Sequence, residues 1–230
     1  MITLYDLAFE DDRRPSPFCW RTKFSLAHKG LDFTSVPMGF TEKEKIAFAD
    51  SKTVPVIKDG EKPVKDSWAI AVYLDDMYPE RLLLKSEMGR AYARFINGWA
   101  DTVVNAGIFP LIIGDLYDRV RPEDKEYIAQ SRGARLGTTD FASFQKQARE
   151  KGLAALRAAL EPARRALRDQ KFLSGAEAAY PDYILAGTFM WPRTVSPLEL
   201  LEKDDPVHAW RERMLDLFDG MARKAKAAEP

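Results

Sequence analysis

The chain has 230 residues, of which 46% are hydrophobic and 30% are charged, and its 35 basic residues balance its 35 acidic residues. This composition is typical of a globular protein with one large domain or two small ones, and it excludes intrinsic disorder. The balanced charge gives no reason to expect nucleic-acid binding. With one cysteine, Cys19, and two histidines, an internal disulfide and a cysteine-rich zinc site are excluded, and we expect no metal cofactor.

Targeting signals are not expected in this chain. Acidic residues between positions 6 and 12 occupy the place where a secretory signal would need an apolar run. The longest apolar stretch, residues 106–113, is far shorter than the roughly 18 residues that a membrane helix needs. We therefore expect a cytoplasmic protein that does not enter membranes.

The chain opens with a predicted strand, helix and strand. Residues 2–7 are rich in β-branched and aromatic types, as in strands. A polar loop leads to a helix over 17–29, with Pro17 at its first position and Gly30 as its stop, and a second strand follows over 31–37. This order implies a parallel pair of strands with a right-handed crossover.

A hairpin and a helix complete the first half. Residues 39–52 are polar and predict a mostly irregular stretch. Strands over 53–57 and 62–65 flank the turn signal Asp59-Gly60, and a helix follows over 68–77. The complete order predicts a thioredoxin-like α/β domain, with a mixed four-stranded sheet and helices on both faces.

From residue 84 onward, the apolar residues recur at helical spacing. Ser86 is a candidate cap for a long helix, and Pro162 should bend the helix over 144–169. Further helices are expected from 122, over 182–190 and over 206–223. We predict a thioredoxin-like domain over residues 1–80, an all-α domain over 84–223 and a frayed tail over 224–230.

Ser16 and Cys19 stand at the start of the first helix. A hydroxyl beside a helix N-terminus can donate to a thiolate, which the helix dipole also favours. The alternative is that Ser16 is only an N-cap. Cys19 lies where a redox motif would have its second sulfur, but Ser16 replaces the first, so exchange within the motif is excluded. We expect Cys19 to be a small buried apolar residue of the helix.

Val54-Pro55 and Asp66-Ser67 are two further candidate ligand sites. Proline within a sheet strand removes a hydrogen-bond donor from the sheet, so its presence needs a reason. A cis peptide bond would supply one, because it would turn the main chain of Val54 outward to pair with an extended peptide ligand. A trans proline on an edge strand is the alternative. Asp66-Ser67 opens a helix whose N–H groups could hold a carboxylate, while Asp66 could pair with an ammonium. Ordinary capping is the alternative there.

The three motifs together fit one ligand, glutathione. They offer a hydroxyl that could bind its thiol, a main chain that could pair with its peptide, and a site for its γ-glutamyl group. In the order and spacing of these motifs, the sequence resembles the cytosolic glutathione transferases over its whole length. Within them it is most similar to the bacterial β-etherases of lignin breakdown and their fungal relatives. Residues 16–23, 28–30, 54–57, 66–71 and 73–75 carry the resemblance, with 160–165, 182–183 and 219–220 later in the chain.

The resemblance implies a role for each motif. Ser16 matches the thiol-activating position, Val54 the main-chain partner of the cysteinyl residue, Pro55 the cis-proline, and Asp66 and Ser67 the γ-glutamyl site. Glutathione would be a co-substrate, and a symmetric homodimer is implied. Ala179 departs from the family, since it replaces the serine or threonine that often precedes the residue equivalent to Asp182 by three positions.

The second substrate would lie between the two halves. Phe18, Trp20, Phe109 and Tyr117 are candidate walls for an aryl group, whereas Trp99 and Trp210 are expected in the core. The function that the resemblance implies is attack of the glutathione thiolate on a hydrophobic aromatic electrophile, with β-aryl ether cleavage as a variant. A protein that binds glutathione or aromatic ligands without turnover is the alternative. Thiol-disulfide exchange through Cys19 is a third.

Overall fold

The computed structural model describes residues 1–228 and begins with a four-stranded mixed sheet in the order β2-β1-β3-β4. Strand β1 pairs in parallel with β2 and antiparallel with β3, which pairs antiparallel with β4. Leu4 of β1 lies opposite Ser35 on one side and Ile57 on the other. The predicted thioredoxin-like sheet is therefore confirmed. The strands are β1 (Ile2–Leu7), β2 (Phe33–Met38), β3 (Val56–Asp59) and β4 (Lys62–Lys65).

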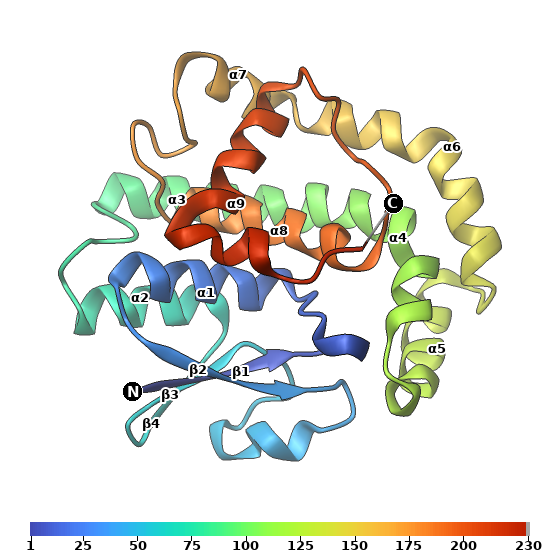
Figure 1. Ribbon diagram of the computed structural model, residues 1–230, viewed down its shortest axis with the longest axis horizontal. Helices are drawn as coiled ribbons and strands as arrows, with labels where there is room; N and C mark the ends of the chain where they lie inside the picture. The colour runs from blue at the N-terminus through green and yellow to red at the C-terminus, as the bar shows by residue number, and fades with distance from the viewer. Residues whose placement is uncertain (229–230) are drawn as a thin grey trace.

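Helices cover both faces of this sheet (Figure 1). Helices α1 (Pro17–Lys29) and α2 (Ser67–Met77) lie between the sheet and the helical half, and the short 3-10 helix η2 (Lys43–Ala49) lies on the opposite side. The sequence predicted a mostly irregular segment at η2. It is ordered there because Ile46, which is fully buried, packs with Met38 and Val56 against the sheet. A second 3-10 helix, η1 (Glu10–Asp12), interrupts the loop between β1 and α1.

The remainder of the described chain is helical. Helix α3 (Glu87–Trp99), a π-helical turn η3 (Ala100–Val104) and helix α4 (Asn105–Arg119) form one continuous rod. By length and composition alone, this rod could cross a membrane, but half of its most apolar window is buried in the protein, as in a core helix. The other helices are α5 (Pro122–Leu136), α6 (Phe141–Ala159), α7 (Glu161–Asp169), α8 (Tyr180–Val195) and α9 (Pro206–Lys224).

Helix α1 packs directly on α8, and this contact joins the two halves. A glycine makes the close approach feasible, because a Cβ at Gly187 would lie 2.5 Å from the Pro17 carbonyl oxygen. Asp182, fully buried in α8, accepts hydrogen bonds from the N–H of Leu173, the N–H of Ala179 and the Trp210 indole. The Asp182 N–H, which a hydroxyl at position 179 would accept, bonds instead to the Ala179 carbonyl at 2.9 Å. The Asp182 carboxylate joins three segments of the helical half.

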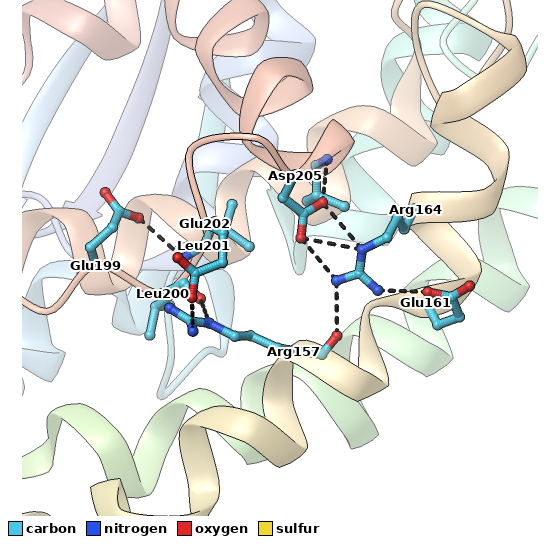
Figure 2. A network of polar contacts seen from close by, with 9 residues as sticks. Arg157, Glu161, Arg164, Glu199, Leu200, Leu201, Glu202 and Asp205 are labelled. Carbon is cyan, nitrogen blue, oxygen red and sulfur yellow. Dashed lines mark hydrogen bonds and ion pairs between the residues drawn. The ribbon is translucent and has the colours of Figure 1, made fainter.

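A polar network fixes the entry to α9 (Figure 2). The Arg164 guanidinium lies 2.9 Å from the carboxylate of Asp205 and 2.7 Å from that of Glu161. The Asp205 carboxylate also caps α9 by accepting the Val207 N–H. Helix α7 is thereby joined to the start of α9. Helix α6 ends at Ala159, just before the predicted bend at Pro162.

Helix α9 ends at Lys224, and the described part of the segment predicted as a frayed tail over 224–230 makes hydrogen bonds to the folded protein. The Arg13 guanidinium donates to the carbonyl of Ala227 at 2.8 Å, and Arg193 donates to that of Ala225 at 3.0 Å. Arg13 also donates to the Thr194 carbonyl. Both arginines are half-buried and lie in folded segments that are distant in sequence from the tail. Residues 229–230 lie outside the described chain.

Candidate functional site

A cavity of about 470 Å³ lies between the two halves of the molecule. Its floor comes from the end of β1, the start of α1 and the segments around β2 and β3. Its other walls come from α4, α5 and α8. The lining includes Ser16, Phe18, Phe40, Lys43, Lys52, Val54, Asp101, Phe109, Tyr127, Arg132, Arg135 and Trp191.

Ser16 caps α1 at the edge of this cavity. Its Oγ accepts a hydrogen bond from the Cys19 N–H at 3.2 Å, and only 5% of the residue is exposed. The expected N-cap is therefore confirmed. A hydroxyl has two acceptor lone pairs and one proton, so the cap leaves the proton free for another acceptor. Capping and donation to a sulfur are compatible in one side chain.

Cys19 faces away from the cavity and is fully buried, as predicted. Burial raises the pKa of its thiol well above the ordinary value, and the nearby Asp6 carboxylate raises it further. A thiol must ionise to act as a nucleophile. Cys19 therefore lacks both the access and the charge state that thiol exchange requires.

A buried ion cluster holds the loop before Ser16. Asp6 on β1 is fully buried, and its carboxylate lies 3.2 Å from the Arg14 guanidinium and 2.5 Å from the Lys23 Nζ. Arg14 belongs to the loop and Lys23 to α1, so the cluster joins strand, loop and helix. This cluster could not be predicted from the sequence, because the partners of an acid in an apolar strand are brought to it only by folding.

The Val54–Pro55 peptide bond is cis, as predicted, and Val54 lines the cavity. Within residues 1–228, no hydrogen bond uses the Val54 N–H or carbonyl. The next main-chain carbonyl, that of Pro55, accepts the Asp66 N–H at 3.2 Å. The fold thus brings Ser16 and Val54 to one cavity and joins the Asp66 turn to Pro55.

Asp66 caps α2 in a left-handed conformation, with φ of 73°. Its Oδ1 accepts the N–H groups of Trp68 and Ala69 at 3.0 and 3.1 Å, and its side chain is exposed. Ser67 beside it is buried, and its carbonyl accepts the Tyr180 hydroxyl of α8 at 2.8 Å. Pro55, Asp66 and Ser67 lie outside the cavity lining. The ordinary capping role of Asp66 is confirmed.

Stacked aromatic pairs form the apolar walls. Phe40 stacks on Tyr127 with ring centroids 5.6 Å apart, and Phe109 stacks on Trp191 at 6.0 Å. Phe18, 37% exposed, faces the same cavity. Of the predicted wall residues, Phe18 and Phe109 are thus in place. The sequence missed the other three rings because they come from three separate segments.

Trp20 and Tyr117 do not line the cavity. Trp20 is 2% exposed, and its indole N–H donates to the Arg14 carbonyl at 2.7 Å, which keeps the ring in the core. Tyr117 packs edge-on against Phe141, 5.1 Å away, on the other side of α4. These two wall predictions are corrected by the structure: both rings satisfy core contacts. Trp210 is in the core as expected, and Trp99 is partly buried.

Polar contacts join the two halves next to the cavity residues Phe40 and Lys43. The buried Asp124 of α5 accepts the N–H and the hydroxyl of Thr41, both at 2.8 Å. The Glu42 carboxylate lies 2.9 Å from the Arg121 guanidinium. Contacts with Lys45, the Gly39 N–H and Arg121 lower the pKa of Glu42 to about 2. These contacts position Phe40, two residues before Glu42, against Tyr127.

Metal ligands are not grouped in the described chain: residues 1–228 contain no cluster of three or more histidine, cysteine, aspartate or glutamate side chains suited to an ion. The chemistry available at the cavity is that of a hydroxyl, an unpaired main chain, aromatic rings and several cations.

Comparison with known families gives two matches. A family model described as "Glutathione S-transferase, C-terminal domain" matches residues 91–220, and one described as "Glutathione S-transferase, N-terminal domain" matches residues 15–77. The first alone covers more than half of the chain.

Individual relatives agree with these matches. Glutathione S-transferase Z2 of Arabidopsis thaliana is 34% identical over 115 residues, 46% of this chain and 50% of that protein. The chain thus spans about half the length of the first curated relatives it matches. A glutathione S-transferase of Ceriporiopsis subvermispora, solved with glutathione, has a TM-score of 0.79 and 22% identity over 95% of this chain and 96% of that one. Glutathione transferase GSTFuA3 of Phanerochaete chrysosporium has a TM-score of 0.76 and 26% identity over 95% and 92%.

Proposed function

Because the chain belongs to the glutathione S-transferase family, we propose that it is a glutathione transferase whose second substrate is a hydrophobic aromatic electrophile. One observation carries the proposal. Ser16 and Val54 line the same cavity as two stacked aromatic pairs. A thiol held beside Ser16 and Val54 would share this cavity with an aryl group held by the rings.

Glutathione would lie along the first domain. The unpaired main chain of Val54 suits the cysteinyl unit, and the N-terminus of α2 suits the γ-glutamyl carboxylate. The exposed Asp66 carboxylate would pair with the γ-glutamyl ammonium, and Ser67 would add a donor. Lys43 and Lys52 at the cavity rim suit the glycine carboxylate. Glutathione is then a co-substrate, and the proposed chemistry uses no metal.

The glutathione thiol would lose its proton to solvent, and the Ser16 hydroxyl would donate a hydrogen bond to the resulting thiolate and stabilise it. The thiolate attacks the electrophilic carbon, a C–S bond forms, and the leaving group departs with its electron pair. In the ether-cleaving variant, the attacked carbon bears an aryloxy group, the C–O bond breaks, and the aryloxide takes up a proton. The similarity of the sequence motifs to β-etherases and the aromatic walls support this variant.

The alternative is a protein that holds glutathione or an aromatic ligand in the same cavity without turnover. Exchange through Cys19 is disfavoured, because the thiol is buried and its pKa is raised. We also propose a cytoplasmic homodimer, with neither nucleic acid nor membrane as a partner. Exposed apolar side chains on α3, Met88 at 78% and Phe95 at 70%, favour the dimer.

Turnover of chlorodinitrobenzene and of a β-aryl ether ketone, each with glutathione, tests the proposal. We expect the glutathione sulfur to displace chloride from the first compound. If the protein also cleaves ethers, the second compound should release its phenol. If glutathione binds by calorimetry but neither compound reacts, the binding alternative is correct. If glutathione does not bind, both readings fail.

A further inference from the structure

The cavity carries a concentration of positive charge that the chain as a whole does not. The full sequence has equal numbers of basic and acidic residues. The cavity lining has four cations, Lys43, Lys52, Arg132 and Arg135, and one acid, Asp101. Asp101 is neutralised by Arg21, whose guanidinium lies 2.6 Å from its carboxylate. In the part of the chain that the structure describes, no ion pair includes any of the four cations.

These cations come from two parts of the chain, which approach each other where the Lys43 Nζ lies 4.8 Å from the centre of the Tyr127 ring of α5. Lys43 and Lys52 belong to the first domain, in η2 and in the segment just before Val54, where glutathione is proposed to bind. Arg132 and Arg135 belong to α5 of the helical domain. Because residues three positions apart share one face of a helix, the two guanidinium groups can reach one ligand.

The two arginines border the aromatic walls. The Arg135 guanidinium lies 4.8 Å from the centre of the Phe109 ring, and that of Arg132 lies 5.9 Å from the centre of the Phe40 ring. Each wall pair therefore has a guanidinium beside it. A ligand ring that packs against these walls would therefore lie near both arginines.

Arg132 is only half exposed, and no carboxylate of the described chain compensates its charge. Burial lowers the pKa of the Arg132 guanidinium, and Arg135 lowers it further. Like charges three residues apart also destabilise a helix. A bound anion would remove both costs, and the planar fork of arginine matches a carboxylate through two parallel hydrogen bonds.

We infer that the second substrate is an aromatic carboxylate, whose ring lies between the walls and whose carboxylate binds Arg132 and Arg135. This inference rests on the proposed function and narrows its substrate class. The reaction is unchanged: the glutathione sulfur bonds to the ring carbon or benzylic carbon, and the leaving group departs with its electron pair. The carboxylate takes no part in bond making and only positions the ring.

The test uses a matched pair of probes, chlorodinitrobenzoic acid and its methyl ester, in which a methyl group replaces the negative charge. The glutathione conjugates of both, prepared chemically, are titrated into the wild-type protein by calorimetry, so that binding is measured without turnover. We expect the acid conjugate to bind about tenfold more tightly than the ester conjugate, the effect of one charge-assisted hydrogen bond. Equal affinity of the two conjugates would overturn the inference.

Variants assign the effect to the arginines. In Arg132→Gln and Arg135→Gln, the preference for the acid conjugate should shrink several-fold, while the affinity for free glutathione stays unchanged. Arg132→Lys, which keeps the charge without the fork, should retain part of the preference. Arg168→Gln, an exposed arginine on α7, is the matched control and should leave it intact. A loss of affinity for free glutathione in Arg132→Gln would assign the arginines to glutathione and overturn the inference.

Turnover of the methyl ester separates this inference from the proposed function. If the wild-type protein turns over the ester, and the acid and ester conjugates bind with equal affinity, the transferase proposal stands and the carboxylate inference fails. If the acid conjugate binds tighter but neither probe is turned over, the specificity inference stands and the catalytic proposal fails.

Discussion

Ser16 is both a helix cap and the candidate activator of a thiol. Its Oγ accepts the Cys19 N–H, which uses one lone pair and leaves the hydroxyl proton available. The burial of Cys19 removes the other sulfur chemistry that the first helix could support. At the scale of single residues, therefore, the cavity contains one candidate group for stabilising a glutathione thiolate and no accessible thiol of its own among the described residues.

Asp66 offers a test that separates its charge from its cap. Asparagine caps helices as well as aspartate does, so Asp66→Asn should leave the melting temperature nearly unchanged. The variant loses the negative charge proposed to pair with the ammonium of glutathione. Because the side chain is exposed, we expect a loss of about 1 kcal/mol in glutathione binding by calorimetry, with little change in kcat.

The result for Asp66→Ala should differ in one respect. Alanine removes both the charge and the cap, so stability should also fall by about 1 kcal/mol. Unchanged glutathione affinity in both variants would remove Asp66 from the binding site.

At the scale of elements, the cavity depends on contacts between the loop after β2 and the start of α5. Glu42 pairs with Lys45 and Arg121, and Asp124 holds Thr41. Neither contact includes Ser16 or Val54, the residues proposed to hold the cysteinyl unit of glutathione. Together they hold Phe40 against Tyr127 and so shape the wall of the cavity.

The low pKa of Glu42 predicts a pH dependence of stability. The folded-state value, about 2, lies below the ordinary value of 4.5. The stabilisation is therefore fully present above pH 4.5 and is lost as the pH falls toward 2. We expect Glu42→Gln to cost about 1 kcal/mol at neutral pH, since the pair is partly exposed. In urea titrations, this difference from wild type should disappear near pH 2; a difference that persists there would contradict the assignment.

Asp182 supports the helical half from inside. Asp182→Ala would leave the buried N–H groups of Leu173, Ala179 and the Trp210 indole without an acceptor. Each unsatisfied buried donor costs about 1–3 kcal/mol. We expect a loss of at least 3 kcal/mol in the free energy of unfolding, measured by urea denaturation. Asp182→Asn, which keeps one acceptor oxygen, should lose less, and equal losses in the two variants would contradict this account.

The elements could be predicted from the sequence because their signals are local. β-Branched and aromatic residues marked the first strand, Asp59-Gly60 marked the hairpin, and Pro17 and Gly30 marked the ends of α1. A proline within a predicted strand, at Val54-Pro55, predicted the cis bond. The aromatic pairs and the arginine pair could not be predicted, because Phe40, Tyr127 and Trp191 meet only after the two halves pack. The hydrogen bonds of residues 224–228 could not be predicted for the same reason, since their partners Arg13 and Arg193 lie far away in sequence.

At the scale of the whole molecule, the cavity lies at the junction of two differently built halves. The α1–α8 contact fixes this junction, with Gly187 permitting the close approach. The sheet domain contributes Ser16 and Val54, and the helical domain contributes most of the aromatic walls and both arginines. Substrate selection can therefore change through α5 without a change in the site proposed for glutathione.

The proposed homodimer is tested by the exposed apolar face of α3. Met88 and Phe95 lie seven residues apart, on one side of this helix. Light scattering should give twice the chain mass of 26.1 kDa for the wild type. Phe95→Glu should give the single-chain mass, whereas Arg168→Glu on α7 should remain dimeric. A wild-type protein with the single-chain mass would contradict the dimer.

The pKa of the glutathione sulfur in the bound complex tests the central claim most directly. It is measured from the ultraviolet absorbance of the thiolate, titrated against pH in the wild-type protein, in Ser16→Ala and, as a control, in Cys19→Ala. If the Ser16 hydroxyl donates to the sulfur, the wild-type and control values should lie below the roughly 8.5 of a free thiol. The value in Ser16→Ala should be higher by about one to two units, which corresponds to a hydrogen bond of about 1.5–3 kcal/mol to a charged group. The same titration midpoint in wild type and Ser16→Ala would contradict the account and leave Ser16 as a cap alone.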